Sequence, residues 1–339
     1  MSMKQYIDKC LAGEHLDADE AAAALELIMT DQASEAQIAG LLIALRAKGE
    51  TVNEVVGFAR TMRRHAVAIR PNDPNAIDVC GTGGDGLGTF NISTVTTLVV
   101  AGAGVTVTKH GNRSASSASG SADVLQALGV NIQLSPSRVE ACVNTVGVGF
   151  LFAPLFHPAM KFVAKTRTDL GVRTIFNILG PITNPAGVTR QLIGTYNDTV
   201  ASRLASALAD LGTGKSCVIH SENGMDEVSL SGRTNVFDVQ ADVTMKSYAV
   251  SADSFGLPNL NGGSVKGGNS SENAAITLGI LRGEMSPRRD VVVANAALGI
   301  YVAGKVESFE EGARMAEESI DSGRALGILE HLVEFTNRP

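Results

Sequence analysis

A glycine-rich segment follows a short β-prone run near residue 80. Residues 77–80 read Ile-Asp-Val-Cys, and residues 81–88 read Gly-Thr-Gly-Gly-Asp-Gly-Leu-Gly, ahead of a helix expected to open near Ser93, after Asn91. Glycine lets backbone N–H groups approach an anion closely, and a helix N-terminus adds favourable potential. The segment therefore predicts a phosphate or pyrophosphate cradle, although a tight glycine turn without a ligand explains the same residues.

Two familiar nucleotide-binding loops are excluded by residue type. A Walker A loop ends in Gly-Lys-Ser/Thr, whereas Gly88 is followed by Thr89 and Phe90. A dinucleotide-binding fold needs an acid at the end of the next strand, about 20 residues further on. The next expected strand, residues 105–108, runs instead into Lys-His-Gly-Asn-Arg. Cations at this position favour a phosphorylated ligand.

A second candidate loop covers residues 109–121. It combines two cations, an amide and seven residues that are serine or glycine, ahead of another expected helix. Lysine neutralises phosphate as a point charge, arginine can bind two oxygens at once, and serine hydroxyls satisfy the remaining lone pairs. This set suits a multiply phosphorylated ligand. A solvated basic turn followed by a serine N-cap is the alternative.

An acidic pair, Asp226 and Glu227, lies between two expected strands, residues 217–220 and 227–230. Adjacent carboxylates on a loop are often solvated surface charges. A pyrophosphate ligand, however, generally arrives with Mg²⁺, which takes one or two carboxylates, keeps waters and bridges to phosphate oxygens. The pair is therefore the candidate magnesium site.

A third basic site covers residues 161–173. Helical spacing places Arg167 on the same side as Met160 and Val163, away from Lys161 and Lys165. An arginine on an apolar face is explained if it reaches a ligand carboxylate in a pocket between domains. A buried structural ion pair explains it equally well.

The elements that must position these residues fall into two groups. The first seventy residues hold three expected helices, each with an N-cap oxygen followed three positions later by an acid or amide. These pairs are Asp17 with Glu20, Ser34 with Gln37, and Thr51 with Glu54. Proline at positions 71 and 74 then halts regular structure. We expect a helical domain over residues 1–72, joined in space by part of residues 157–190.

From residue 73 to residue 339 we expect an α/β domain. Short β-prone runs alternate with helical stretches, which argues for a largely parallel or mixed sheet with helices around it. The expected strands are residues 77–80, 105–108, 148–152, 191–194, 217–220, 227–230, 236–239 and 243–250. Helices are expected from Ser93 and Ser121, and over residues 272–282, 288–302, 309–320 and 325–335.

Composition narrows the class of protein. The chain of 339 residues carries 28 basic and 35 acidic residues, a net charge of −7, so it has no basic field to hold nucleic acid. Its 4 cysteines are too widely spaced for a zinc site or a disulfide framework, which predicts buried thiols in a reducing compartment. No apolar stretch reaches the length of a signal peptide or membrane span. We expect a cytoplasmic protein that binds no membrane.

Several motifs, in order along essentially the whole chain, resemble the anthranilate phosphoribosyltransferases. They are Gly-Thr-Gly-Gly-Asp (81–85), Asn-Ile-Ser-Thr (91–94), Lys-His-Gly-Asn-Arg-Ser (109–114), His-Pro-Ala-Met-Lys (157–161), Arg-Thr-Ile-Phe-Asn-Ile-Leu-Gly-Pro (173–181), Asn-Pro (184–185) and Asp-Glu (226–227). One departure is Ala118, where many members carry a larger, often basic, side chain.

The resemblance implies a small helical domain hinged to a larger α/β domain, and a homodimer formed through the helical domain. It implies transfer of the 5-phosphoribosyl group from 5-phosphoribosyl 1-diphosphate (PRPP) to the amine of anthranilate, a step towards tryptophan, with Mg²⁺ as cofactor and no protein nucleophile. Magnesium would be held by Ser93, Asp226 and Glu227, and anthranilate by Gly81, Asn112, His157 and Arg167.

The resemblance also implies a PRPP site. Its residues would be Gly81, Gly84, Asp85, Thr89, Asn91, Ile92, Ser93, Thr94, Lys109, His110, Gly111, Asn112, Arg113, Ser114, Ala115, Ser116, Ser117 and Ser121. Two rival functions remain open on the sequence alone. A pyrimidine nucleoside phosphorylase would share the architecture but bind free phosphate and a nucleobase. A non-catalytic nucleic-acid-binding relative would show a basic surface and could lack the acidic pair.

Overall fold

Four helices form the N-terminal domain, and three of them begin at the predicted caps. In the computed structural model the side chains of Asp17, Ser34 and Thr51 each accept a hydrogen bond from the first turn of the helix that follows. The helices are α1 (Met3–Leu11), α2 (Ala18–Met29), α3 (Glu35–Lys48) and α4 (Val52–His65). The first of them was not predicted.

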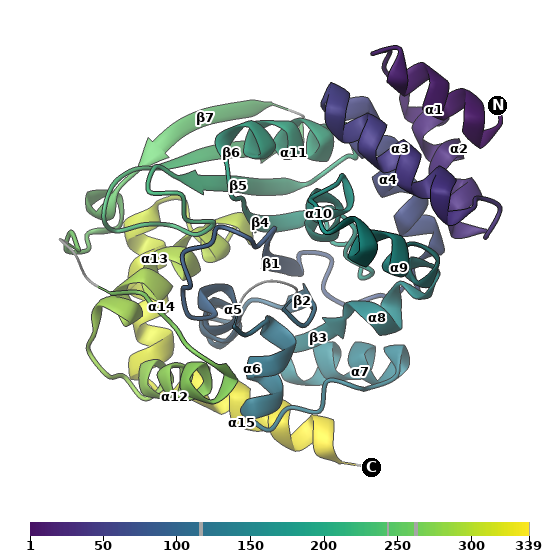
Figure 1. Cartoon of the computed structure of the whole chain (residues 1–339). Coiled ribbons are helices and arrows are strands. Elements are labelled where there is room, and N and C mark those ends of the chain that lie inside the picture. The colour runs from purple at the N-terminus through teal and green to yellow at the C-terminus, as the bar shows by residue number, and fades with distance from the viewer. Residues whose placement is uncertain (115–117, 243, 261–263, 339) are drawn as a thin grey trace.

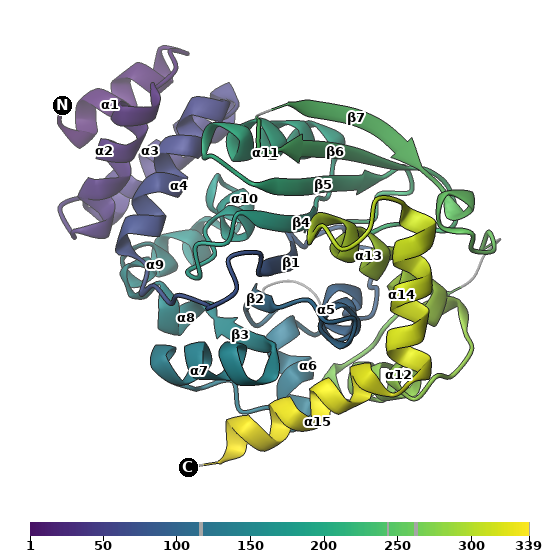
Figure 2. The same cartoon turned by 180° about the vertical axis from the view of Figure 1, so that it is seen from behind.

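The structure describes residues 1–114, 118–242, 244–260 and 264–338. Figures 1 and 2 show the helical domain at one corner of the molecule and the C-terminal helix, α15 (Arg324–Asn337), along the opposite side. The sheet lies between them. This arrangement confirms the predicted fold class, a small helical domain beside a larger α/β domain.

Within the described residues, seven strands make one mixed sheet in the order β3-β2-β1-β4-β5-β6-β7. Strands β1 to β5 run parallel, and β6 and β7 are antiparallel to their neighbours. The strands are β1 (Ile77–Gly81), β2 (Val107–Gly111), β3 (Val148–Phe152), β4 (Arg190–Gly194), β5 (Lys215–Ser221), β6 (Thr234–Gln240) and β7 (Met245–Val250).

The two faces of the sheet pack into two separate hydrophobic cores. Because side chains alternate across a strand, Ile77 and Leu192 enter one core, while Cys80 and Ile193 enter the other. The first core is covered by α5 (Ile92–Gly102), α12 (Ser270–Leu281), α13 (Pro287–Val302), α14 (Phe309–Asp321) and α15. The second is covered by α11 (Asp198–Asp210) and continues into the helical domain.

The segment between β3 and β4 touches both domains. It holds α8 (Ala153–Phe156), α9 (Lys161–Leu170) and α10 (Phe176–Leu179). The buried side chains of Val163 and Phe176 share a core with those of α2, α3 and α4. The exact domain boundaries stay a prediction. Between β2 and β3 the chain forms α6 (Ser121–Ala127) and α7 (Pro136–Val146).

The predicted strand over residues 227–230 is wrong. The chain forms no strand there, because side chains bind the backbone in place of a neighbouring strand. The N–H of Val228 donates to Oδ1 of Asn295 at 2.9 Å, and the N–H of Ser229 donates to Oγ1 of Thr234 at 3.0 Å. An apolar run can therefore be buried as a loop when polar side chains satisfy its peptide groups.

The predictions about cysteines and membrane spans can be compared directly with the structure. All four cysteines are buried and unpaired, as predicted. Within the described ranges, no helix combines the length and the apolar character that crossing a bilayer requires.

Candidate active site

The candidate loops all follow carboxyl ends of parallel strands. The chain adds β2 and β3 on one side of β1, and β4 starts a second series on the other side. In open α/β sheets, ligands bind in the crevice outside the carboxyl ends where the strand order reverses in this way. Here the reversal lies between β1 and β4, so the glycine-rich loop after β1 borders the crevice.

The acidic loop after β5 contacts the glycine-rich loop directly. Oδ2 of Asp226 accepts a hydrogen bond from the N–H of Gly83 at 3.0 Å. A Cβ atom at Gly81 would lie 3.0 Å from that same oxygen, and one at Gly194 would overlap the carbonyl oxygen of Asp226. Glycine at the ends of β1 and β4 is therefore what allows the acidic loop to sit between them.

The second acid of the pair holds the start of α5. Oε1 of Glu227 accepts a hydrogen bond from the N–H of Ser93 at 3.1 Å. The ammonium group of Lys109 donates to Oγ of Ser93 at 3.2 Å and to the carbonyl of Val79 at 2.7 Å. Lys109 is only 3% exposed. It lies beneath the loops and supports Ser93, where the sequence suggested a cation facing the ligand.

Acidic side chains gather at this place, and their ionised forms are disfavoured. Burial, together with the nearby Asp85 carboxylate, raises the pKa of Asp226 to about 7. Burial and the charge of Asp226 hold the pKa of Glu227 well above its usual range. In the described part of the chain neither acid forms an ion pair. Carboxylates so placed would be stabilised by a cation.

The donor set fits magnesium bound partly by a ligand. Oδ2 of Asp85 is buried without a hydrogen-bond partner, and Asp226 and Glu227 lie close by. Among the described residues no three metal-ligating side chains are grouped tightly enough to make a preformed centre. Mg²⁺ commonly takes one or two protein carboxylates and completes its octahedron with waters and phosphate oxygens.

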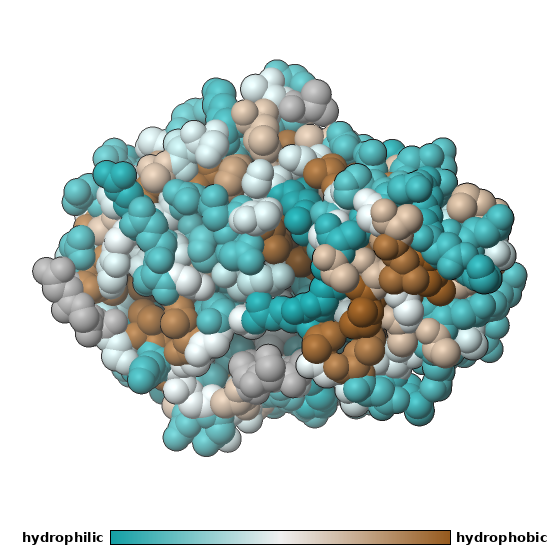
Figure 3. Space-filling view, turned by 45° about the horizontal axis from the view of Figure 1, so that its top comes forward, coloured by the Kyte–Doolittle hydropathy of each residue, from teal (hydrophilic) through white to brown (hydrophobic). Residues whose placement is uncertain are grey.

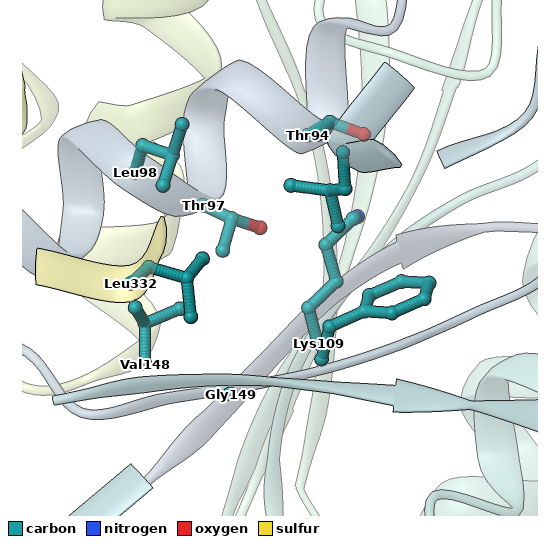
Figure 4. Close-up of a pocket in the computed structure, with 9 residues that line it drawn as sticks. Thr94, Thr97, Leu98, Lys109, Val148, Gly149 and Leu332 are labelled. Carbon is teal, nitrogen blue, oxygen red and sulfur yellow. The ribbon is translucent and has the colours of Figure 1, made fainter. Parts of the chain in front are cut away.

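The start of α5 contributes less side-chain chemistry than the sequence suggested. Ile92 is buried in the core, and its N–H already donates to the carbonyl of Phe90 at 2.7 Å. Thr94 is 1% exposed, and its Oγ1 has no partner in the structure. Figure 4 shows Thr94 and Lys109 beside a small cavity between α5 and the sheet, closed by apolar side chains such as Leu332. The lining of this small cavity is largely apolar, which does not suit a phosphorylated ligand.

The loop after β2 is partly held by its own helix. Arg113 donates to Asp123 at 2.6 Å and to Gln126 at 2.8 Å, so its guanidinium is already engaged. Oγ of Ser121 donates to the carbonyl of Asn112 at 3.3 Å. Gly111 ends β2, Ser114 and Ala118 follow in the loop, and Ala115, Ser116 and Ser117 lie outside the described residues.

Two buried histidines lie together where the sheet meets the segment between β3 and β4, which holds α8, α9 and α10 and is called the helical segment below. The rings of His110 and His157 are 5.1 Å apart between centroids. Burial lowers the pKa of His110 to about 3 and that of His157 to about 4, so both rings are neutral at pH 7. His110 Nδ1 lies 3.2 Å from the carbonyl of Gly180, which can only accept, so Nδ1 carries the proton. Nε2 of each ring is buried without a partner.

Arg167 lies on α9 with Val163 facing the shared core, as the spacing predicts. Its guanidinium lies over the ring of Phe176, 5.4 Å from the centroid. Across the described chain, no carboxylate pairs with Arg167, so the alternative of a structural ion pair finds no support there. Burial lowers the pKa of this guanidinium. A partly desolvated, unpaired cation is suited to a ligand carboxylate.

Arg173 ends the third basic site of the sequence analysis, where no contact was predicted for it. Its guanidinium donates to the carbonyl of Gly84 and lies over the ring of Tyr196, 4.1 Å from the centroid. Its own carbonyl accepts a hydrogen bond from Arg46 on α3. Arg173 therefore connects the helical domain with the glycine-rich loop. Its place in a motif rich in apolar residues gave no signal of this contact.

Apolar side chains are exposed on one face of the molecule. Figure 3 shows them gathered on the side where Figure 1 places the helical domain. A site with an apolar wall and polar loops suits a ligand that carries both an apolar ring and charged groups.

Comparison with known proteins agrees with this architecture. The family described as "Glycosyl transferase family, a/b domain" matches residues 73–326, and the family described as "Glycosyl transferase family, helical bundle domain" matches residues 4–66. The anthranilate phosphoribosyltransferase of Pelotomaculum thermopropionicum is 50% identical over 334 residues, which cover 98% of this chain and 96% of the relative.

Solved structures give the same answer. The crystal structure of the anthranilate phosphoribosyltransferase from Thermus thermophilus superposes with a TM-score of 0.92 at 42% identity, covering 98% of this chain and 99% of that one. The enzyme from Saccharomyces cerevisiae in complex with PRPP and Mg superposes with a TM-score of 0.88 at 29% identity, covering 98% and 97%. With both the sequence and the fold matched over nearly the whole length, the chain belongs to the anthranilate phosphoribosyltransferase family.

Proposed function

We propose that this chain transfers the 5-phosphoribosyl group from PRPP to the amine of anthranilate, giving N-(5-phosphoribosyl)anthranilate and pyrophosphate in tryptophan biosynthesis. The observation that carries the proposal is the contact of Asp226 and Glu227 with the glycine-rich loop and the start of α5. This contact brings the proposed anion-binding and metal-binding residues together where the strand order of the sheet reverses. A non-catalytic nucleic-acid-binding relative would be expected to have a basic surface and could lack the acidic pair. This chain has a net charge of −7 and retains Asp226 and Glu227.

PRPP would bind across the two loops. The glycine-rich loop would offer backbone N–H groups and the Asp85 carboxylate, and the start of α5 would offer the Ser93 hydroxyl and the favourable potential of a helix N-terminus. The second loop offers polar groups around Asn112, with Lys109 supporting Ser93 from below. Magnesium would be held by Ser93, Asp226 and Glu227, and it would neutralise charge on the pyrophosphate. The solved complex of the yeast relative with PRPP and Mg supports this choice of cofactor.

The reaction needs stabilisation of a leaving group more than a protein nucleophile. Breaking the anomeric C–O bond builds negative charge on pyrophosphate and positive charge on the ribose ring, so backbone donors of the glycine-rich loop would lower the barrier by binding the departing group. The amine of anthranilate must face the anomeric carbon, which is a matter of positioning and of closing the site against water.

Anthranilate would lie on the side of the helical segment. Arg167 would bind its carboxylate, and the neutral rings of His110 and His157 would border the aromatic ring and its amine. Gly81 and Asn112 would complete the pocket from the sheet. Because both histidines have lowered pKa values, either can accept a hydrogen bond from the amine at neutral pH.

We extend the proposal to assembly and compartment. Residues 1–72 carry exposed apolar side chains, among them Leu11 at 70% and Ile43 at 40%. These are the side chains that a homodimer through the helical domain would cover. Four buried free thiols suit a reducing cytoplasm.

One assay tests the function. Anthranilate fluorescence should decay when the protein is mixed with PRPP and Mg²⁺, and it should stay constant if either is omitted. Phosphorolysis of thymidine or uridine, measured in parallel, tests the nucleoside phosphorylase alternative. Phosphorolysis without loss of anthranilate would overturn the proposal.

A further inference from the structure

Asn273 lies outside every segment to which the sequence assigns chemistry. It stands in the first turns of α12, on the part of the chain between β7 and α13, and its side chain is 2% exposed. The chain just before it, residues 264–269, runs alongside the end of the glycine-rich loop. Nothing in the proposed reaction uses α12, so the buried amide needs its own explanation.

A directed chain of hydrogen bonds passes through this amide. Oδ1 of Asn273 accepts from the N–H of Gly268 at 2.8 Å, and its Nδ2 donates to Oδ1 of Asn91 at 2.8 Å. Nδ2 of Asn91 then donates to the carbonyl of Ser119 at 3.1 Å. Because a peptide N–H only donates and a carbonyl only accepts, the two ends fix the orientation of both amides.

The backbone around Asn273 also grips the glycine-rich loop. The N–H of Phe90 donates to the carbonyl of Val265 at 3.1 Å, and the N–H of Gly267 donates to the carbonyl of Gly88 at 2.9 Å. A Cβ atom at Gly267 would lie 2.5 Å from Cα of Phe90 and 2.6 Å from Oδ1 of Asn273. The approach is so close that only glycine fits without movement.

The two residues reached by the chain belong to different loops. Asn91 directly precedes the first turn of α5, where the N–H of Ser93 binds Glu227. Ser119 lies near the end of the loop after β2, next to Gly120, the N-cap residue of α6. One buried side chain on α12 therefore fixes the distance between the two loops at their C-terminal ends.

We propose that Asn273 is a positioning residue for PRPP, one that keeps both loops in register through Asn91 without touching the substrate. The inference rests on the proposed function, since it takes the two loops as the PRPP site. Residues that orient ligand-binding groups from behind commonly change affinity or activity by roughly 10- to 100-fold when they are lost.

The test is PRPP binding measured by calorimetry in the presence of Mg²⁺. Wild-type protein that binds no PRPP would reject the proposed function, whatever the variants do. If wild type binds, Asn273→Ala should bind PRPP roughly tenfold or more weakly, while the anthranilate KM at saturating PRPP stays within roughly twofold. Unchanged PRPP affinity in a folded Asn273→Ala protein would overturn the inference.

A matched control separates positioning from general damage to α12. Thr277 is fully buried one turn further along the helix, and its hydroxyl donates to the carbonyl of Asn273 at 2.8 Å. Thr277→Val removes a buried polar group from the same helix without contact to Asn91. It should leave PRPP affinity near wild type. Equal losses in Thr277→Val and Asn273→Ala would assign Asn273 a purely structural role.

Asn273→Asp tests the role of the Nδ2 donor alone. It replaces Asn273→Ala in the experiment if the alanine variant is unstable. The carboxylate still accepts from Gly268 but cannot donate to Asn91, so PRPP affinity should fall at pH 8 as it does for Asn273→Ala. Protonation of the introduced acid restores a donor, so the deficit relative to wild type should shrink as the pH is lowered. A pH-independent deficit would argue against the hydrogen bond to Asn91.

Coupling gives the last arm of the experiment. If Asn273 acts through Asn91, adding Asn273→Ala to an Asn91→Ala protein should weaken PRPP binding by less than roughly twofold further, since contacting residues are not additive. Fully multiplicative losses would show that the two amides act independently and would overturn the proposal.

Discussion

Asp226 and Gly83 are joined by a hydrogen bond of 3.0 Å across 143 positions of sequence. The contact holds the acidic loop against the glycine-rich loop. The second acid, Glu227, accepts a hydrogen bond from the N–H of Ser93 at 3.1 Å. Both carboxylates thus lie against the two segments proposed to bind pyrophosphate. We therefore expect metal binding and anion binding to depend on each other.

Replacing the acidic pair should therefore expose the metal requirement. We expect Asp226→Asn with Glu227→Gln to fold, because the amide oxygens can still accept from Gly83 and Ser93. The variant should lose activity or need much more Mg²⁺, since neutral amides are weak magnesium ligands. Activity titrated against Mg²⁺ measures this. Wild-type activity at limiting Mg²⁺ would contradict the metal assignment.

The glycine-rich loop can be tested at Gly84. Its φ is +80°, and a Cβ atom there would lie 2.9 Å from the guanidinium of Arg173. We expect Gly84→Val to weaken PRPP binding strongly, because it displaces Arg173 and occupies space beside the loop. Calorimetry with PRPP and Mg²⁺ reports the affinity.

Gly104→Val is the control for the effect of backbone strain alone. Gly104 has a similar φ of +83° after α5, and nothing lies within 4 Å of a Cβ atom there. Both variants should lose a comparable amount of stability, of order 1–2 kcal/mol for a side chain forced into the left-handed region. Only Gly84→Val should lose PRPP. Intact PRPP affinity in Gly84→Val would make the segment a structural turn.

The features that the sequence predicted correctly are those set by local chemistry. Caps such as Asp17 and Thr51 determine helix starts through neighbours three residues away. The glycine-rich run is also followed by a helix, as predicted, while its role in anion binding stays a prediction. Helix α11 also carried a local signal that was not used. Asn197 caps it, and apolar residues recur at Val200, Leu204 and Leu208.

The features that it missed depend on contacts between distant segments. The sequence predicts that Lys109 faces the ligand, but β2 continues through it and buries its side chain under α5. Arg173 contacts Gly84 only because the helical segment folds over the carboxyl end of β1. No pattern within either segment encodes these contacts, so the support of the site became visible only in three dimensions.

Acid should destabilise the protein through its buried histidines. The pKa of His157 falls from 6.5 to about 4 on folding because burial disfavours the charged ring. Between these two pH values the folded state binds fewer protons than the unfolded state. The free energy of unfolding therefore has its full value above pH 6.5 and decreases as the pH falls towards 4. At pH 5 the loss is about 1–2 kcal/mol from this residue.

Urea unfolding of wild type and His157→Gln at pH 7 and pH 5 measures that contribution. His157→Gln should lose less stability than wild type between the two pH values, because glutamine has no proton to bind. Identical losses in the two proteins would mean that His157 is charged or exposed in solution.

Arg167 is assigned to the carboxylate of anthranilate because it is desolvated, lies over Phe176 and pairs with no acid among the described residues. Removing one partner of a desolvated charge pair costs roughly 2–5 kcal/mol. Arg167→Ala should therefore raise the anthranilate KM strongly or abolish saturation, while PRPP binding without anthranilate stays near wild type.

The exposed Lys165, on the same helix, provides the comparison for Arg167. Its ammonium group pairs with Glu35 and Asp169 at the surface, so Lys165→Ala should change neither substrate constant, since exposed ion pairs contribute little. A purely structural Arg167 would behave differently from a carboxylate anchor, because its removal would lower the unfolding midpoint and weaken both substrates together. That joint loss, or unchanged kinetics in Arg167→Ala, would place the anthranilate carboxylate elsewhere in the junction between α9 and the sheet.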